Sequence, residues 1–171
     1  MMAMFVAATM LYGPYLWCRF RRETFETYGL RWTLPAGALK ETALWTALTL
    51  PPLTFIALGW PGLSLPHSPS LQTATTQITA GFVAAIVEET FFRGWVQSLL
   101  SRRLGALPSI VVASGLFALS HRIVRPEPIF LATFFPGLVM GFLRHRHGSV
   151  APAALYHGLG NIWAVWFFPL P

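Results

Sequence analysis

The chain has 171 residues, of which 54% are hydrophobic and 11% are charged. Soluble domains carry about 25% charged residues, so this composition is typical of a membrane protein and excludes a disordered chain. The net charge is +6, yet too few polar residues remain to form the solvated basic face of a nucleic-acid-binding protein, and we expect no nucleic-acid partner.

Six charge-poor segments predict an all-α membrane protein with about six transmembrane helices, because a helix needs about 20 mostly apolar residues to cross a bilayer. Arginines follow the first apolar segment, whereas a signal peptide carries its positive charges before the apolar region, so we interpret this segment as a retained helix. Pro51 and Pro52 predict a kink in the second helix. In chain order the segments are 1–18, 40–60, 72–93, 104–120, 128–143 and 147–168.

Lys and Arg are distributed unequally between the two ends of this predicted bundle. Arg122 and Arg125 lie in the loop after the fourth helix, and nine others lie in the loops after the first, third and fifth helices. The positive-inside rule therefore predicts that these nine face the cytoplasm and that both chain termini lie on the other side. The nine are Arg19, Arg21, Arg22, Arg31, Lys40, Arg102, Arg103, Arg144 and Arg146.

The polar side chains that are costly to place inside a membrane fall in three short strings of the predicted helices. Ionisable groups at membrane depth usually line a cavity and indicate a functional site. In each string two members lie four positions apart, which places them on one helix face. At about 1.5 Å per residue, all three strings lie roughly 10–20 Å from the cytoplasmic ends of their predicted helices. Three neighbouring helices can therefore present these side chains to one pocket. The strings are EETFFRG (Glu88, Glu89, Arg93), FALSH (Phe117, His121) and HGLGN (His157, Asn161).

This set of side chains suits the hydrolysis of an amide bond. A carboxylate can take a proton from water, one imidazole can position that water, and a second imidazole with an amide can donate to the oxyanion. Arg93 can neutralise Glu89, which leaves Glu88 as the freer base. Each feature also has a structural interpretation: a packed ion pair, a core histidine, or an Asn161 that joins two helices by a hydrogen bond.

The three strings resemble the signature of the CPBP family of intramembrane proteases, which includes the CAAX prenyl endopeptidases and the bacterial Abi proteins. The resemblance covers roughly residues 72–168. It implies that residues 1–71 hold two N-terminal transmembrane helices and a basic cytoplasmic loop, and that residues 72–171 form a catalytic core of four helices. The matching motifs are EExxxR (Glu88, Glu89, Arg93), FxxxH (Phe117, His121) and HxxxN (His157, Asn161).

The resemblance implies a glutamate-dependent endopeptidase of the bacterial inner membrane, with a membrane-anchored protein or peptide as its substrate. Glu88 and His121 would activate water, and His157 and Asn161 would form the oxyanion hole. Glu89 and Arg93 would support the site. We expect no cofactor, since the chain lacks the zinc motif HExxH, although Glu88 and the two histidines are of the types that bind zinc.

Two other functions remain open. The chain could be a non-catalytic membrane protein of the same fold that acts as an immunity or partner-binding factor. It could also be a small proton-coupled transporter in which Glu88 and the histidines relay protons. The sequence shows no inverted repeat of the kind found in many transporters.

Overall fold

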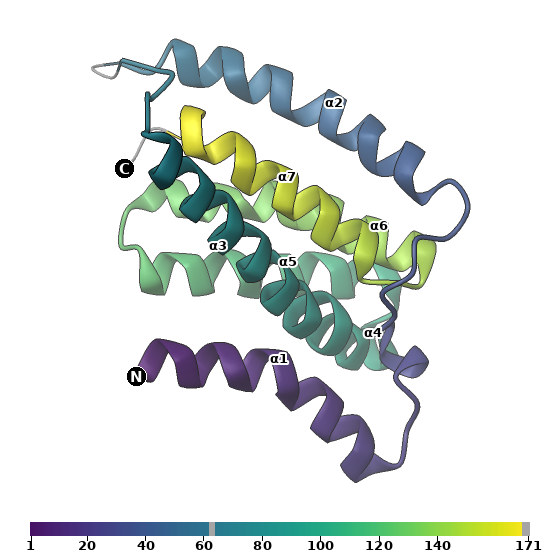
Figure 1. Cartoon of the computed structure of the whole chain (residues 1–171). Coiled ribbons are helices and arrows are strands. Elements are labelled where there is room, and N and C mark those ends of the chain that lie inside the picture. Colours follow the sequence, from purple (N-terminus) through teal and green to yellow (C-terminus); the bar gives the residue numbers. More distant parts are fainter. Residues whose placement is uncertain (62–63, 169–171) are drawn as a thin grey trace.

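The computed structural model describes residues 1–61 and 64–168, and over these residues its regular structure is entirely helical (Figure 1). Helix occurs in each of the six predicted segments. The α-helices are α1 (Met2–Arg21), α2 (Ala38–Leu58), α3 (Leu71–Glu89), α4 (Gln97–Leu104), α5 (Ala106–Val124), α6 (Phe134–His147) and α7 (Ala151–Phe167). The other elements are the 3-10 turns η1 (Glu26–Tyr28) and η3 (Pro128–Thr133) and the π-helix η2 (Thr90–Val96).

Local sequence explains several helix ends. The Ser70 side chain accepts a hydrogen bond from the backbone N–H of Thr73 at 3.1 Å, which caps the start of α3. Gly148 ends α6 in the left-handed conformation, with φ of 61°, which favours glycine. The α2 helix continues through Pro51 and Pro52 to Leu58, so the two prolines do not end it.

The surface of the bundle is rich in large apolar side chains. Phe55, Leu107 and Ile123 are 78%, 74% and 83% exposed, and soluble proteins rarely leave so much apolar surface in water. Two helical segments are long and apolar enough to cross a membrane, namely Ala106–Val124 and Pro128–His147. The larger number of about six spans stays a prediction, as does the division of the chain at residue 72.

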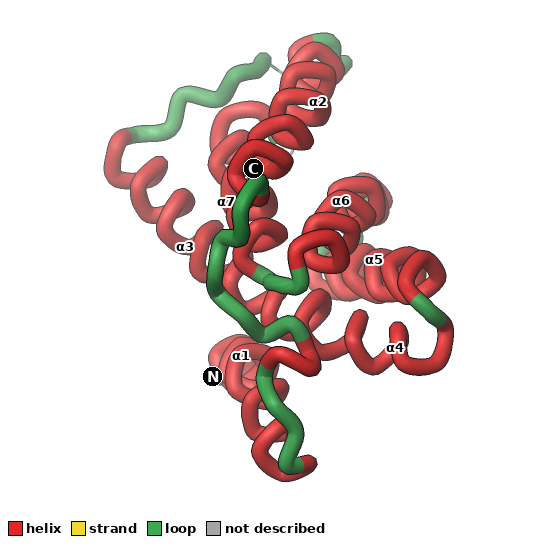
Figure 2. The backbone as a smooth tube through the Cα atoms, turned by 90° about the vertical axis from the view of Figure 1, so that its right-hand side faces the viewer, coloured by secondary structure: helices red, strands yellow, loops and turns green. Residues whose placement is uncertain are grey.

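The α7 helix lies at the centre of the bundle. It packs against α3, α2 and α6, while α5 packs against α6 (Figure 2). The α1 and α2 helices lie on opposite sides of the group formed by α3 to α7 (Figure 1). Because α1 packs against both α3 and η2, it covers the part of the chain that contains the EETFFRG string.

The segment between α1 and α2 is attached to the ends of the core helices. The Ser149 hydroxyl, at the start of α7, contacts the backbone carbonyls of Arg31 and Thr33 at 2.6 and 2.7 Å. Arg102 of α4 donates two hydrogen bonds to Glu23, both of 3.1 Å. The loops that carry most of the Lys and Arg therefore meet at one end of the bundle, as the sequence predicts.

Candidate active site

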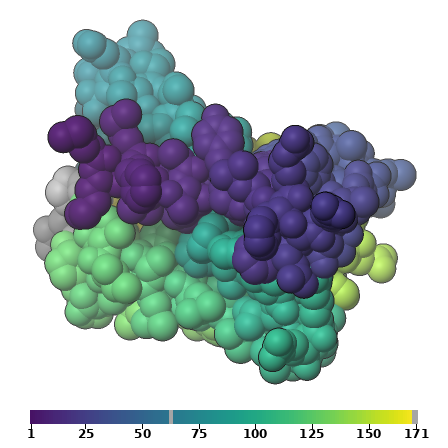
Figure 3. Space-filling view, turned by 90° about the horizontal axis from the view of Figure 1, so that it is seen from below, coloured from purple at the N-terminus to yellow at the C-terminus, as the bar shows by residue number. Residues whose placement is uncertain are grey.

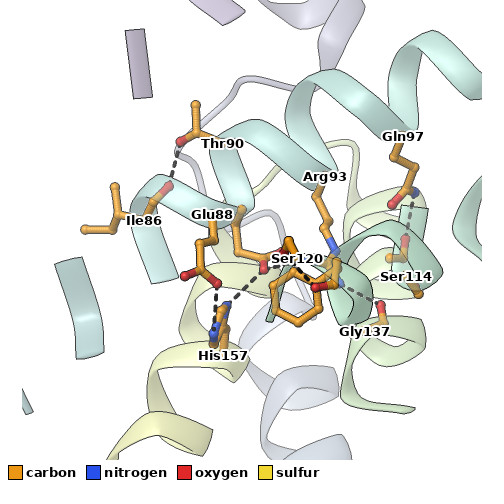
Figure 4. A network of polar contacts seen from close by, with 12 residues as sticks. Ile86, Glu88, Thr90, Arg93, Gln97, Ser114, Ser120, Gly137 and His157 are labelled. Atoms are coloured by element: carbon orange, nitrogen blue, oxygen red, sulfur yellow. Dashed lines mark hydrogen bonds and ion pairs between the residues drawn. The ribbon is translucent and has the colours of Figure 1, made fainter. Parts of the chain in front are cut away.

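Glu88 lies near the end of α3 and faces imidazole rings from two other helices. Its Oε2 atom is 3.7 Å from Nε2 of His121 on α5. The same atom is 3.8 Å from Nε2 of His157 on α7, which lies beside Glu88 in Figure 4. These distances are too long for direct hydrogen bonds, but a water molecule can bridge groups at such a separation. Oε2 is buried and has no hydrogen-bond partner among the described residues. The three side chains thus surround a place suited to one water molecule.

The other nitrogen of each imidazole is held by an acceptor. Nδ1 of His121 lies 3.1 Å from the backbone carbonyl oxygen of Phe117. Nδ1 of His157 lies 3.0 Å from Oε1 of Glu89. Carbonyl and carboxylate oxygens accept hydrogen bonds, so each Nδ1 carries the proton and donates it. Both rings are therefore oriented with Nε2 toward Glu88.

Glu89 and Arg93 form an ion pair that is fully buried. Nη1 of Arg93 donates to Oε1 of Glu89 at 3.0 Å, and both side chains are 0% exposed. Nη2 of Arg93 donates to the backbone carbonyl of Gly137 on α6 at 3.1 Å. A series of contacts therefore runs from α6 through Arg93 and Glu89 to His157. Figure 4 shows Gly137, Arg93 and His157 around the same centre. Such a pair is costly to break, because either partner alone would leave an uncompensated buried charge.

Arg93 lies in the π-helix η2, which directly follows Glu89. Single π-helical turns are rare in proteins, and those that occur are often found at functional sites. The sequence predicts an uninterrupted helix here, and the string EETFFRG contains no proline or other signal that would have indicated the wider turn. The Glu89–Arg93 contact that the four-residue spacing predicts is nevertheless present.

Two side chains after Glu89 are bonded to two glycines of α6. Besides the bond from Arg93 to Gly137, Nε2 of Gln97 donates to the backbone carbonyl of Gly141 at 3.0 Å. A Cβ atom at Gly137 would lie 3.1 Å from Cβ of Ser114 and 3.2 Å from Nη2 of Arg93. Small residues four apart allow such close helix packing, and this spacing is the sequence signal that could have identified Gly137 and Gly141.

Phe117, the first residue of the FxxxH motif, packs between the charged and the imidazole groups. The guanidinium carbon of Arg93 lies 4.3 Å from the centre of its ring. The ring centres of His121 and His157 lie 4.4 and 5.6 Å from it. The sequence alone predicts no role for this ring. In the structure it is an apolar wall that helps to fix Arg93 and both histidines.

Asn161 is bonded to a different part of α3. Its Nδ2 atom donates to the backbone carbonyl of Gly81 at 2.9 Å, and a Cβ at Gly81 would lie 2.9 Å from Cβ of Asn161. Among the described residues it has no hydrogen bond to Glu88, His121 or His157. One N–H of the Asn161 amide thus joins α3 to α7. The role of Asn161 in an oxyanion hole stays a prediction, and the second N–H would serve it.

Glu88, His121 and His157 supply donor atoms of the types that zinc binds. In a tetrahedral site with Zn–N distances of about 2.0–2.1 Å, the ligand atoms lie about 3.3–3.4 Å apart. The distances from Oε2 of Glu88 to the two Nε2 atoms, 3.7 and 3.8 Å, are longer. Over residues 1–61 and 64–168, no group of three or more His, Cys, Asp or Glu is arranged to hold a metal ion. In this structure the three groups lie slightly farther apart than zinc ligands do, and the expectation of no cofactor stays a prediction.

The fold and the site together define a helical membrane protein with a carboxylate and two imidazoles gathered between its helices. Residues 69–163 match the family model described as type II CAAX prenyl endopeptidase, Rce1-like. This match covers more than half of the chain and includes every predicted site residue. The chain therefore belongs to this family of membrane-embedded CAAX-type proteases, which confirms the resemblance seen in the sequence. The comparisons with curated proteins and with solved structures gave no match.

Proposed function

We propose that this protein is an intramembrane endopeptidase that hydrolyses a peptide bond of a membrane-anchored protein or peptide with a water molecule activated by Glu88. One observation carries the proposal. The buried Oε2 atom of Glu88 has no hydrogen-bond partner within residues 1–61 and 64–168 and faces the Nε2 atoms of two imidazoles. A base and two oriented rings around one small space are what the activation of water requires.

In the first step, Glu88 accepts a proton from the water molecule as the water oxygen attacks the scissile carbonyl carbon. His121 keeps its proton on Nδ1, which donates to the carbonyl of Phe117. Its Nε2 lone pair can therefore accept the second hydrogen of the water and hold the oxygen in line for attack. Positioning of this kind lowers the entropic part of the barrier.

In the same step, the electron pair of the carbonyl bond moves to the oxygen and forms an oxyanion. Glu89 accepts the Nδ1–H of His157 and thereby stabilises a positively charged ring, whose Nε2–H would donate to the oxyanion. The free N–H of Asn161 would be the second donor. Glu88 then passes its proton to the leaving nitrogen as the C–N bond breaks, which yields an amine and a carboxylic acid and restores the site.

The substrate can be identified by an experiment in cells. We would compare the membrane proteomes of cells that express the wild-type protein, Glu88→Gln or Glu26→Gln, the last being a control at an exposed glutamate. We expect an uncleaved membrane-anchored precursor with Glu88→Gln only. If every precursor is processed with Glu88→Gln, the protein is not the protease. Flux driven by a pH gradient in liposomes that Glu88→Gln abolishes would then favour a transporter.

A further inference from the structure

A hollow lies at the C-terminal end of α1, and none of the residues that contact Glu88 lines it. It is a hollow of about 580 Å³ between the last turns of α1 and the chain that returns from it. The α1 helix lies on the surface of the molecule (Figure 3). Its lining includes the basic Arg19 and Arg22, the acidic Glu23, and the side chains of Tyr12, Tyr15 and Leu16.

The hollow is formed by a reversal of the chain that aromatic contacts hold in place. Arg22 ends α1 in the left-handed conformation, with φ of 56°. The returning chain then packs Phe25 edge-on against Tyr15, with ring centres 5.3 Å apart. Nε1 of Trp32 donates to the hydroxyl of Tyr15 at 2.9 Å. The wall of the hollow is thus a defined part of the fold.

The charges at this hollow are unbalanced. Arg19 and Arg22 are exposed, and among the described residues their side chains have no ion pair or hydrogen bond. Glu23 also lines the hollow, but its carboxylate is already paired with Arg102 through two hydrogen bonds. Two unpaired guanidinium groups beside tyrosine rings form a site for an anionic oxygen group such as a phosphate, because guanidinium geometry matches it.

An apolar track leads away from these arginines along the same face of α1. Leu16, Tyr12 and Phe5 are 65%, 61% and 73% exposed, and helical spacing puts all three on the side that carries Arg19. From Leu16 to Phe5 the helix rises about 16 Å, close to half of the roughly 30 Å hydrocarbon core of a bilayer. A ligand that fits both parts has an anionic head and a long apolar chain.

We propose that this hollow binds an anionic phospholipid, with Arg19 and Arg22 on its phosphate and one acyl chain along Leu16, Tyr12 and Phe5. The location agrees with this ligand, because this end of the bundle carries most of the Lys and Arg, and anionic lipid headgroups attract such ends. The proposal is independent of the proteolytic function, since it uses none of the residues around Glu88.

Native mass spectrometry of the purified full chain in detergent tests the site with phosphatidylglycerol as the probe. We expect wild type to bind a first phosphatidylglycerol molecule about 10- to 30-fold more tightly than the variant Arg19→Gln/Arg22→Gln, if each arginine contributes the usual amount. Arg21→Gln is the matched control, because Arg21 lies at the same helix end but over the ring of Trp17. It should bind the lipid as wild type does.

Binding measurements with two other ligands and one further variant identify which part of the lipid is recognised. Phosphatidylcholine and glycerol 3-phosphate should both bind more weakly than phosphatidylglycerol, since the first has a neutral headgroup and the second lacks acyl chains. Leu16→Asn should weaken phosphatidylglycerol binding with an unchanged melting temperature in detergent alone. Equal binding by the double-arginine variant and wild type would overturn the proposal, as would equal binding of phosphatidylcholine or of glycerol 3-phosphate.

Discussion

His157 donates its Nδ1 proton to Oε1 of Glu89 at 3.0 Å, and the same oxygen accepts a hydrogen bond from Arg93 at 3.0 Å. Glu89 is completely buried, so its negative charge is balanced by the guanidinium and also fixes the imidazole. Of the two adjacent glutamates, Glu89 therefore holds an imidazole ring, and Glu88 is the one that we propose exchanges a proton with water.

The ion pair of Glu89 and Arg93 should be essential to the stability of the fold. We predict that Glu89→Gln lowers the free energy of unfolding by about 3–5 kcal/mol, because the buried Arg93 loses the one carboxylate that it contacts among the described residues. The double variant Glu89→Met/Arg93→Met should recover part of this loss. Unfolding in detergent micelles measures both effects. An unchanged unfolding free energy for Glu89→Gln would contradict the interpretation.

Gly137 should be sensitive to a single added methyl group. We predict that Gly137→Ala destabilises the protein by about 1–3 kcal/mol and lowers cleavage, because the new Cβ would crowd Ser114 and displace Arg93. Gly115→Ala is the matched control, since Gly115 is also helical and a Cβ there meets nothing within 4 Å. Thermal melting and cleavage assays compare the two variants, and equal effects would argue against a positioning role for Gly137.

Glu23 should make the stability of the protein depend on pH. Hydrogen bonds from Arg102 and then from Tyr28 lower the pKa of Glu23 below its usual value of 4.5. A lowered pKa in the folded state means that Glu23 stabilises the fold above pH about 4.5 and that this contribution is lost as the pH falls through the lower value. We predict that Glu23→Gln melts below wild type at pH 7.

The test for Glu23 is a series of melting curves between pH 7 and pH 2.5. The difference in melting temperature between wild type and Glu23→Gln should be constant down to pH about 4.5 and should shrink below it. Because the pair with Arg102 is partly exposed, high salt should also reduce the difference at pH 7. A difference that stays the same over the whole pH range would show that the carboxylate charge has no part in it.

The distances around Glu88 lead to a prediction about metal dependence. Because the Oε2–Nε2 separations of 3.7 and 3.8 Å exceed those of a zinc site, we expect 1,10-phenanthroline to leave the cleavage rate unchanged. Elemental analysis of the active protein is the second readout. Loss of cleavage with the chelator, together with recovery on addition of Zn²⁺, would instead assign Glu88 and the two histidines as metal ligands.

Much of the site could be predicted because it depends on local spacing and on the cost of burying charge. Residues four apart share a helix face, which indicated the contact between Glu89 and Arg93. The absence of other ionisable groups at this depth pointed to Glu88, His121 and His157 as neighbours, and the structure brings these three together. Six charge-poor segments likewise indicated the six helical regions.

Other features could not be predicted because they depend on tertiary packing. The π-helix after Glu89 has no signal in the sequence, since many residues are compatible with it. The bond from Arg93 to the carbonyl of Gly137 requires that two helices 44 residues apart in sequence approach closely. The bond from Asn161 to Gly81 depends in the same way on how α3 and α7 pack, and one asparagine can serve both helix packing and catalysis.

The role of Glu88 as the base is tested most directly with purified protein in liposomes, using the precursor that proteomics identifies. We predict that Glu88→Gln cleaves this precursor about 10²- to 10⁴-fold more slowly than wild type, the usual contribution of a general base. The variant should melt as wild type does, because Glu88 is partly exposed and its Oε2 atom has no hydrogen bond to lose in the part of the chain that the structure describes. A folded Glu88→Gln protein that cleaves at the wild-type rate would contradict the proposed function.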